Sequence, residues 1–390
     1  MTAPQRTPWG LWRAVVNPLD YLLSKAAFLL DVNNDTLPPG LVFTGDANRT
    51  YFGPDGVLRT AGVNEWPVEY DPVTLKRVDR KIWEARTNQV LNSNIVTPGP
   101  GSTYVQDGPA LLSGVPSQRL TVAGSRFLRD VALTANGTVA LSWWIWTATA
   151  GRAMQLILKD YTSDTVRATT NFVSVAGWQR VAVVGAVAGA GNGCRAEWAG
   201  PVVGDCFFGM QVETGSFVTP YIITGAAAVT RATPSAALSG SAFSAVWNPS
   251  GGTLFTEASQ PALVGASKTA VGVSNGGGTN RTSHYVNSAG AINLYTNPAP
   301  STIVTGPNAA AGVLWRRATS FAAGTCSTSA NGGGVVERAH TMDLAAMNVL
   351  TLGNAFPGAS EHWNGGIKRA AYIPTALPNR LLQSLGMAGL

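Results

Sequence analysis

Short runs of β-forming residues, separated by tight glycine turns, are the feature that most limits how this chain can fold. Residues 141–147 and 178–184 are typical runs, and residues 275–278 and 331–334 are typical turns. Charged residues make up only 12% of the chain, against roughly 25% in an ordinary soluble domain. This composition and spacing are typical of antiparallel strands joined by hairpins. We therefore expect a mostly β chain with few long helices.

The N-terminal segment contains the one strong helical signal. Thr7-Pro8 and Asn17-Pro18 each place a capping side chain directly before a proline, which suits the first helical position. Apolar residues recur at helical spacing after these caps: Trp9, Leu11, Trp12, Val16, Leu19, Leu22 and Leu23. This surface either packs back on the chain's own sandwich or buries against another protein or a symmetry mate. We favour an anchor that binds a partner, because an exposed patch with two tryptophans would be an aggregation hazard.

The stretch 49–94 contains four phrases in a fixed order. They are Thr50-Tyr51-Phe52, Gly56-Val57-Leu58-Arg59-Thr60-Ala61, Tyr70-Asp71-Pro72 and Glu84-Ala85-Arg86-Thr87-Asn88. In wording and spacing they closely resemble a module near the N-terminus of many tailed-phage virion proteins, especially tail fibres and appendages, where it precedes a β-sandwich. The resemblance implies a virion structural protein. For the module itself it implies only an architectural role, since the module has no established chemistry.

Two later phrases resemble parts of sandwich domains. Residues 208–222 (FGMQVETGSFVTPYI) are similar to the end of jelly-roll domains in phage structural proteins, which are themselves similar to carbohydrate-binding modules. Residues 363–374 (WNGGIKRAAYIP) resemble the last strand of laminin-G or concanavalin-A-like sandwiches, which leads into a short helix, here residues 378–385. These resemblances imply two tandem antiparallel β-sandwiches in a mostly β fold.

We accordingly expect four segments in the chain. Residues 1–36 form an N-terminal helical anchor, residues 37–92 a β-arm connector, residues 93–232 a jelly-roll-like β-sandwich, and residues 233–390 a laminin-G/concanavalin-A-like β-sandwich. A length of 390 residues fits this division, because ordinary domains have roughly 100–200 residues.

Aromatic residues are the candidates for carbohydrate binding. Side chains alternate between the two faces of a strand, so Trp144 and Trp146 share one face of residues 141–147. That face either forms a platform that stacks on a sugar ring or is covered by the arm or a neighbouring subunit. His362 and Trp363 are candidate residues at the rim of the second sandwich, with core packing as the alternative.

The cysteine and histidine content argues against a disulfide scaffold and a zinc site. There are three cysteines and three histidines, without the spacing of a zinc motif. Cys194 and Cys206 flank the turn-like Ala199-Gly200-Pro201, so they either form a bridge across a hairpin or stay free, and Cys326 is expected to be free. No cluster of Asp and Asn residues suits calcium, so we expect no metal.

Several function classes have no support in the sequence. The net charge is +6, but the basic residues are scattered, and we expect no nucleic-acid partner. No stretch approaches the roughly 20 apolar residues of a spanning helix, so we expect no membrane insertion. No nucleophile, metalloprotease or phosphate-binding motif is present, and no pair of carboxylates is identified by spacing. We therefore expect neither an enzyme nor a cofactor.

The function that these observations predict is that of a bacteriophage virion structural protein. The first hypothesis is a tail fibre or receptor-binding appendage that docks on other virion proteins through its N-terminus and presents its sandwiches to host surface glycans. The alternative is a head-decoration or head-fibre protein without a specific receptor role. We expect a homo-oligomer, with a trimer favoured, that is assembled in the host cytoplasm and exposed on the released virion.

Overall fold

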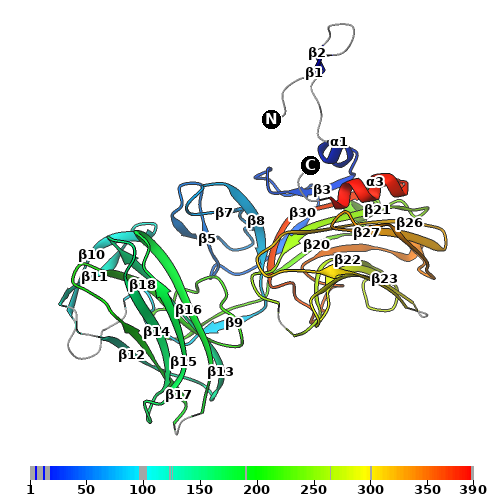
Figure 1. Cartoon of the computed structure of the whole chain (residues 1–390). Helices are drawn as coiled ribbons and strands as arrows, with labels where there is room; N and C mark the ends of the chain where they lie inside the picture. The colour runs from blue at the N-terminus through cyan, green and yellow to red at the C-terminus, as the bar shows by residue number, and fades with distance from the viewer. Residues whose placement is uncertain are drawn as a thin grey trace. The chain divides into compact units, whose positions relative to one another are not determined.

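The computed structural model describes residues 5–6, 12–13, 18–95, 103–122, 124, 126–188, 191–263, 265–298 and 301–387 (Figure 1). Strands make up most of its regular structure, and the helices are few and short. The expectation of a mostly β chain with antiparallel sheets is confirmed. The chain divides into two compact units. Unit 1 comprises Met1–Thr44, Val78–Trp83 and Pro234–Leu390, and unit 2 comprises Gly45–Arg77 and Glu84–Thr233.

Unit 2 contains two main sheets. In sheet order, the larger has β16 (Gly177–Val187), β13 (Gly137–Thr147), β18 (Cys206–Thr214), β11 (Val115–Val122), β10 (Thr103–Leu112), β6 (Leu58–Thr60) and β5 (Thr50–Phe52). The four-stranded sheet has β12 (Arg126–Ala132), β17 (Gly193–Ala199), β14 (Ala153–Asp160) and β15 (Val166–Val173). The short strands β7 (Glu69–Tyr70), β9 (Arg86–Asn88) and β19 (Val229–Arg231) complete the unit, and β9 pairs with β19.

Aromatic side chains fill the space between the two main sheets of unit 2. Trp143 and Phe207 come from the seven-stranded sheet, and Phe127 and Trp198 come from the four-stranded sheet. The ring centroid of Phe127 lies 5.0 Å from that of Trp143 and 4.6 Å from that of Phe207. Burial of each phenylalanine stabilises the fold by about 1.5–3 kcal/mol before the cost in conformational entropy. The two sheets therefore form a β-sandwich with one shared core.

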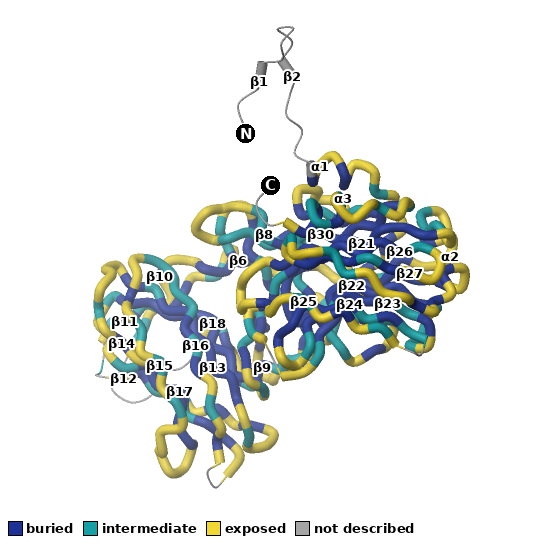
Figure 2. The backbone as a smooth tube through the Cα atoms, turned by 45° about the vertical axis from the view of Figure 1, so that its right-hand side comes forward, coloured by how far each residue is buried: buried dark blue, intermediate teal, exposed yellow. Residues whose placement is uncertain are grey.

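Unit 1 is a second sandwich. One sheet has, in order, β25 (Thr302–Asn308), β24 (Ala291–Asn297), β23 (Arg281–Val286), β22 (Lys268–Ser274), β29 (Val349–Leu352), β20 (Ser235–Ser239) and β4 (Val42–Thr44). The other has β28 (Val336–Ala339), β27 (Thr325–Ala330), β26 (Trp315–Ala322), β21 (Gly252–Ser259), β30 (Gly365–Ile373) and β8 (Arg77–Ile82), and β3 (Phe28–Asp31) also pairs with β30. Its helices are α1 (Pro18–Leu23), α2 (Gly240–Ser244), the 3₁₀ turn η1 (Leu344–Ala346) and α3 (Asn379–Gly386). Figure 2 shows that strands are mostly buried and connecting loops mostly exposed.

Polar side chains join the two sheets inside unit 1. The ring of His284 on β23 is hydrogen-bonded to Thr256 of β21 at 2.9 Å and to Thr319 of β26 at 2.8 Å. Arg317 of β26 donates to the carbonyl oxygens of Ile292 at 2.7 Å and Val304 at 3.0 Å, in the opposite sheet. Burial lowers the pKa of Arg317 to about 9. The interior of unit 1 is thus held partly by a hydrogen-bonded network, since buried polar groups need partners.

The N-terminal segment is part of unit 1, which corrects the prediction of a separate anchor. Helix α1 begins at Pro18, as the Asn17-Pro18 signal predicted, but Leu19, Leu22 and Leu23 are buried in one cluster with Leu382 and Leu385 of α3. These three leucines offer no docking face, because the chain's own sandwich already covers them. Strand β3 follows α1 and pairs with β30, with Phe28 opposite Tyr372.

The first predicted helix is not found in the described residues. Trp12–Arg13 forms the short strand β2, which pairs with β1 (Gln5–Arg6), and the Trp12 side chain is outside what the structure describes. Trp9, Leu11 and Val16 of the predicted anchor also lie outside the described residues. Their role in binding a partner stays a prediction.

The predicted β-arm does not form a separate segment. Strands β5 and β6 extend the large sheet of unit 2, whereas β4 and β8 pair within unit 1. The Asp71-Pro72 turn is present, and Asp71 Oδ1 accepts hydrogen bonds from the backbone N–H groups of Val73 and Thr74. The turn at Asp71-Pro72 could therefore be predicted from the sequence. The division of residues 37–92 between two sandwiches could not.

Candidate functional site

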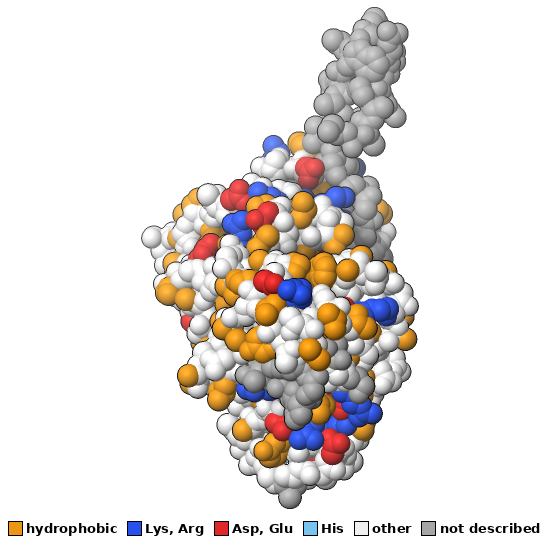
Figure 3. All heavy atoms as spheres, turned by 90° about the vertical axis from the view of Figure 1, so that its left-hand side faces the viewer, with side chains coloured by type: hydrophobic (Ala, Val, Ile, Leu, Met, Phe, Trp, Pro, Cys, Tyr) orange, Lys and Arg blue, Asp and Glu red, His pale blue; other side chains and the backbone are white. Residues whose placement is uncertain are grey.

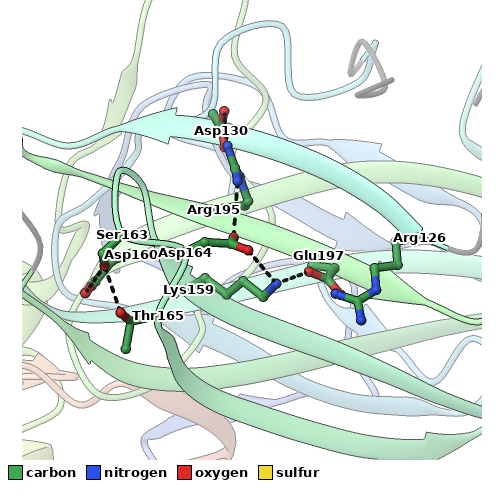
Figure 4. Close-up of polar contacts among 9 residues, drawn as sticks. All are labelled: Arg126, Asp130, Lys159, Asp160, Ser163, Asp164, Thr165, Arg195 and Glu197. Carbon is green, nitrogen blue, oxygen red and sulfur yellow. Dashed lines mark hydrogen bonds and ion pairs between the residues drawn. The ribbon is translucent and has the colours of Figure 1, made fainter. Parts of the chain in front are cut away.

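The outer face of the four-stranded sheet in unit 2 holds a row of charged side chains (Figure 4). Cys194, Ala196 and Trp198 of β17 point into the core. Because successive side chains point to opposite faces, Arg195 and Glu197 point outward. Lys159 of β14 lies opposite Arg195 in the strand register and shares this outer face.

These side chains form a continuous chain of ion pairs. Glu197 is fully buried and lies between Arg126, at 2.9 Å, and the ammonium of Lys159, at 2.5 Å. Lys159 is also 3.3 Å from Asp164 Oδ2.

The ion-pair chain continues from Asp164 back to β12, the strand on which it begins at Arg126. Asp164 lies 3.1 Å from Arg195 Nη1. Arg195 binds both carboxylate oxygens of Asp130, at 2.6 and 3.0 Å, and this pairing raises the pKa of Arg195. Three cations and three anions thus neutralise one another along the sheet. On the face drawn in Figure 3, acidic and basic side chains likewise lie in mixed groups.

The turn between β14 and β15 is fixed by a second ion pair. Asp160 accepts hydrogen bonds from Nε and Nη2 of Arg167 at 2.8 and 2.5 Å, and also from the Ala188 N–H. The Arg167 contact, opposed by burial, lowers the pKa of Asp160 to about 2. The Ser163 hydroxyl is hydrogen-bonded to Asp160 and to the Thr165 hydroxyl within the same turn. These contacts hold the neighbouring Tyr161 and Asp164 in place.

A pocket of about 570 Å³ opens beside this turn, at the β12 edge of the sandwich. Val90, Val131 and Leu133 supply apolar walls, while Arg129, Asp130, Tyr161 and Asn192 supply polar groups or an exposed ring. The volume lies within the range of about 300–1,000 Å³ that is typical of small-ligand sites, which combine apolar walls with few polar groups. All lining residues belong to unit 2.

Arg129 is the distinctive residue of this pocket. It has the same strand parity as Phe127 and Val131, which are buried in the core, so its side chain leaves β12 on the inner side. Its Nε is buried without a hydrogen-bond partner, and within the described parts of the chain no acid pairs with it. By contrast, its neighbour Asp130 is bound by Arg195. Arg129 therefore offers N–H donors to a ligand in the pocket.

The remaining polar groups suit recognition of a hydroxylated ligand. Tyr161 is 44% exposed and presents a ring at the pocket wall. Asn192 is exposed, and its side-chain amide makes only a long contact, 3.4 Å, with the Thr134 carbonyl. Asp130 is the one carboxylate in the lining, whereas glycoside hydrolysis requires two. The arrangement can bind a ligand but does not supply a pair of acids for its cleavage.

The tryptophans predicted to form a sugar platform lie elsewhere. Trp144 is buried against Phe52, with ring centroids 5.6 Å apart, and the guanidinium of Arg180 lies 5.7 Å from its ring. Trp146 lies on the same face of β13 and is half-buried. Trp144 is a packing residue that β5 covers, so it is not a sugar platform, and the alternative that the residues of the predicted arm cover this face is confirmed.

His362 and Trp363 precede β30 in unit 1. Trp363 is fully buried, its ring centroid lies 5.5 Å from that of Trp315, and its Nε1 donates to the Gly366 carbonyl at 3.1 Å. Trp363 is a core residue and not a rim ligand, which confirms the alternative of core packing. His362 is half-buried. His362 and Trp363 belong to unit 1, whereas Trp144 and Trp146 belong to unit 2.

The sequence analysis did not predict the residues that line this pocket. Arg129, Tyr161 and Asn192 come from one strand and two separate loops, so no linear motif links them. One signal was available: Arg129 stands at an inward position between Phe127 and Val131, where an apolar residue is expected.

Neither a disulfide nor a metal cluster is found in the described residues. Cys194, Cys206 and Cys326 are free and buried, so the possible bridge between Cys194 and Cys206 does not form. These two cysteines lie on strands of opposite sheets, not across one hairpin. Over the same residues, no group of three His, Cys, Asp or Glu side chains could hold a metal ion. No helix in the described ranges is long and apolar enough to cross a membrane.

Comparison with known proteins gives only distant likenesses. No family model and no curated protein matches the sequence. The CBM40 of the Ruminococcus gnavus IT-sialidase, solved with α2,3-sialyllactose, is 14% identical with a TM-score of 0.32, over 36% of this chain and 84% of that chain. Domains LG4-5 of the mouse laminin α1 chain are 10% identical with a TM-score of 0.27, over 74% and 96% of the two chains. A Limulus polyphemus SAP-like pentraxin is 15% identical, with a TM-score of 0.27, over 35% and 70%.

Proposed function

We propose that this protein is a virion appendage of a tailed phage, such as a tail fibre or receptor-binding protein, that binds a host surface glycan in the pocket of unit 2. The virion assignment rests on the four phrases in residues 49–94, which resemble a module of such proteins. The glycan assignment rests on one observation, the Arg129 side chain that stands without an acid partner in a pocket next to the exposed ring of Tyr161.

The chemistry of this pocket suits a sugar. The C–H face of a pyranose ring is apolar and packs on an aromatic ring such as Tyr161 or on the wall formed by Val131 and Leu133. The hydroxyl or carboxylate groups of the sugar accept hydrogen bonds from Arg129 and Asn192. One such pocket binds weakly, and several copies in an oligomer raise the apparent affinity by multivalency. The proposal therefore includes a homo-oligomer, with three copies favoured.

The Arg129→Ala variant tests the pocket. Binding of the full-length protein to host cells is measured by flow cytometry, and binding to a glycan array identifies a ligand for titration calorimetry. Loss of a hydrogen bond from a charged donor weakens binding by about 1.5–3 kcal/mol, or at least tenfold in Kd. The matched control is Arg119→Ala on β11, which removes an exposed arginine paired with Asp107 at 2.5 Å.

Three results of these binding experiments would contradict different parts of the proposal. A folded wild-type protein that binds neither host cells nor any glycan overturns the receptor-binding role. Binding that Arg129→Ala and Arg119→Ala leave equally intact overturns the pocket as its location. Release of reducing ends from host polysaccharide would reveal an enzyme, against our expectation.

The place of the protein on the particle needs a separate measurement. Immunogold labelling of intact virions is expected to place the protein at the tail. Labelling confined to the capsid would overturn the tail assignment and favour a head-decoration or head-fibre protein. Absence from purified virions would overturn the virion proposal itself. Light scattering of the full chain measures the number of copies, with three expected.

A further inference from the structure

The outer face of the seven-stranded sheet in unit 1 carries a second set of polar and aromatic side chains. His284 of β23 points inward, since it is hydrogen-bonded to Thr319 of the opposite sheet. Arg281 and Tyr285 have the opposite parity and point outward. Tyr295 of β24 lies opposite Ser283 in the register and shares this outer face.

Arg281 lies against two aromatic rings on this face. Its guanidinium carbon is 4.7 Å from the ring centroid of Tyr295 and 5.1 Å from that of Phe356. Both distances fall within the roughly 6 Å over which a cation and a ring attract each other. Its Nε is buried without a hydrogen-bond partner, and the described residues place no acid in contact with it. Aromatic rings thus contact the Arg281 guanidinium, and no carboxylate among the described residues neutralises its charge.

Glycines at two positions leave room for the loop that carries Phe356 to lie next to Arg281. A Cβ atom on Gly272 of β22 would lie 2.3 Å from the Ala355 carbonyl oxygen, so only glycine lets the loop lie directly on the sheet. A Cβ atom on Gly278 would lie 3.2 Å from the Phe356 ring. Within the loop, the Asn354 side chain donates to the Ala359 carbonyl at 2.8 Å. The ring is therefore preorganised against Arg281.

Aromatic and aliphatic side chains lie near Arg281 on the same face. The rings of Tyr285 and Tyr295 meet edge to face, with centroids 6.5 Å apart. Ile303 of β25 lies opposite Tyr295 in the register and is 53% exposed. This combination offers apolar surface for a sugar ring next to a planar cation for an anion.

We propose that Arg281, Tyr285, Tyr295, Ile303 and Phe356 form a second saccharide-binding site, which takes sugars that carry an anionic group. The guanidinium fork binds a carboxylate, sulfate or phosphate oxygen pair, while the neighbouring side chains contact the ring. An acidic saccharide fits better than a nucleic acid, because nucleic-acid binding neutralises many phosphates, and this face offers one unpaired arginine among its described residues.

This site goes beyond the proposed function and does not depend on it. Arg281 belongs to unit 1, whereas the pocket with Arg129 belongs to unit 2. Defined oligosaccharides are used here in place of host cells. Failure of host-cell binding therefore leaves this test intact, and failure of this test leaves the pocket of unit 2 intact.

The test is titration of the full-length protein with four probes in the same buffer. An oligogalacturonate tetrasaccharide supplies carboxylates, a heparin tetrasaccharide supplies sulfates, maltotetraose is neutral, and an eight-nucleotide oligothymidylate supplies phosphates. We expect one of the two acidic oligosaccharides to bind at least about tenfold more tightly than maltotetraose, as one charged hydrogen-bonded contact provides. The acidic oligosaccharide that binds shows whether the site prefers a carboxylate or a sulfate.

Three variants locate the binding. Arg281→Gln should weaken acidic-sugar binding about tenfold, and Arg281→Lys should also weaken it because a point charge lacks the planar fork. The control Arg338→Gln removes an exposed cation from β28 of the same unit and should leave the affinity unchanged. Circular dichroism checks that each variant is folded.

Several results would overturn the site. They are equal binding of maltotetraose and the acidic sugars, binding of oligothymidylate alone, no binding of either acid by folded protein, or equal losses in Arg281→Gln and Arg338→Gln.

Discussion

Glu197 in unit 2 and Arg317 in unit 1 are both fully buried charged residues, yet the two sandwiches hold them differently. Glu197 lies between two cations, at 2.9 and 2.5 Å, in an ion-pair chain on the outer face of a sheet. Arg317 lies between two sheets and donates to two carbonyl oxygens and to Thr328, without a carboxylate among these partners. Opposite charges compensate the buried charge of Glu197, whereas backbone and hydroxyl oxygens solvate that of Arg317.

This difference determines which change should destabilise the fold around each buried charge. A buried ion pair is strongly destabilised when one member is removed, because the other charge stays buried without compensation. A charge that is solvated by neutral dipoles is sensitive instead to further charge nearby, such as protonation of a neighbouring ring. The surroundings of Glu197 should therefore be most sensitive to removal of that acid, and the surroundings of Arg317 should be most sensitive to pH.

The largest effect is expected for Glu197→Ala. The change leaves Lys159, whose side chain is 6% exposed, without its partner at 2.5 Å. We expect the free energy of unfolding of unit 2 to fall by about 3–5 kcal/mol. Urea unfolding of the full chain, followed by tryptophan fluorescence, measures this loss.

Two variants serve as controls for that measurement. Asp107→Ala breaks the pair with Arg119 at the surface and should cost far less than Glu197→Ala, because solvent screens such a pair. The double variant Glu197→Met/Lys159→Met removes both buried charges and should recover much of the loss. If Glu197→Ala costs no more than Asp107→Ala, the contrast between buried and exposed pairs fails.

A smaller, pH-dependent effect is expected in unit 1. Burial, together with the charge of Arg317, lowers the pKa of His284 well below its usual value. The unfolded chain binds a proton near pH 6.5 that the folded chain does not bind, so the stability is present above that pH and is lost as the pH falls. The loss approaches about 1.4 kcal/mol per pH unit.

Unfolding at pH 7.5, 6.5 and 5.5 measures this slope, and His284→Gln should flatten it. Burial also lowers the pKa of His340, which contributes in the same direction, so His340→Gln serves as the matched control and should retain most of the slope. Asp160, with a pKa of about 2, titrates at lower pH and does not interfere. Equal slopes in wild-type and His284→Gln would contradict the assignment.

The third comparison concerns the reactivity of buried thiols and tests how tightly the two sandwiches are closed. Burial raises the pKa of Cys194 to about 12, and it raises the pKa of Cys206 in unit 2 and Cys326 in unit 1 to about 11. Since the thiolate is the reactive form, labelling by iodoacetamide at pH 8 should be at least about a hundredfold slower than for a free thiol. Mass spectrometry of native and unfolded protein measures the three rates. Rapid labelling of one native cysteine would show that its sandwich opens.

Much of the local structure could be predicted from the sequence. The runs 141–147 and 178–184 are strands within β13 and β16, and the predicted helix at 378–385 corresponds to α3. Alternation of side chains correctly placed Trp144 and Trp146 on one face of β13, and the structure shows that Trp143 and Ile145 lie on the core face. These successes share a cause, because strand alternation, turn glycines and caps act between residues that are close in sequence.

The candidate sites could not be predicted in the same way. The sequence left open whether Trp144 forms a sugar platform or is covered, because its partner Phe52 lies 92 positions earlier in the chain, on β5. The apolar residues of α1 were read as an anchor because α3, which covers them, lies at the opposite end of the sequence. Arg129 is a candidate binding residue only because other segments complete the pocket around it, and Arg281 only because other segments supply the rings against it.

The sequence by itself determined that this chain forms short antiparallel strands, where they turn, and which of their side chains are apolar. These properties follow from backbone preferences and from the alternation of side chains along each strand. Only the tertiary structure decided that the first 44 residues belong with the last 157, which charges are paired, and which arginines stay unpaired. Pairing and exposure depend on contacts between residues far apart in the chain, and no local pattern encodes which distant strand will cover a given face.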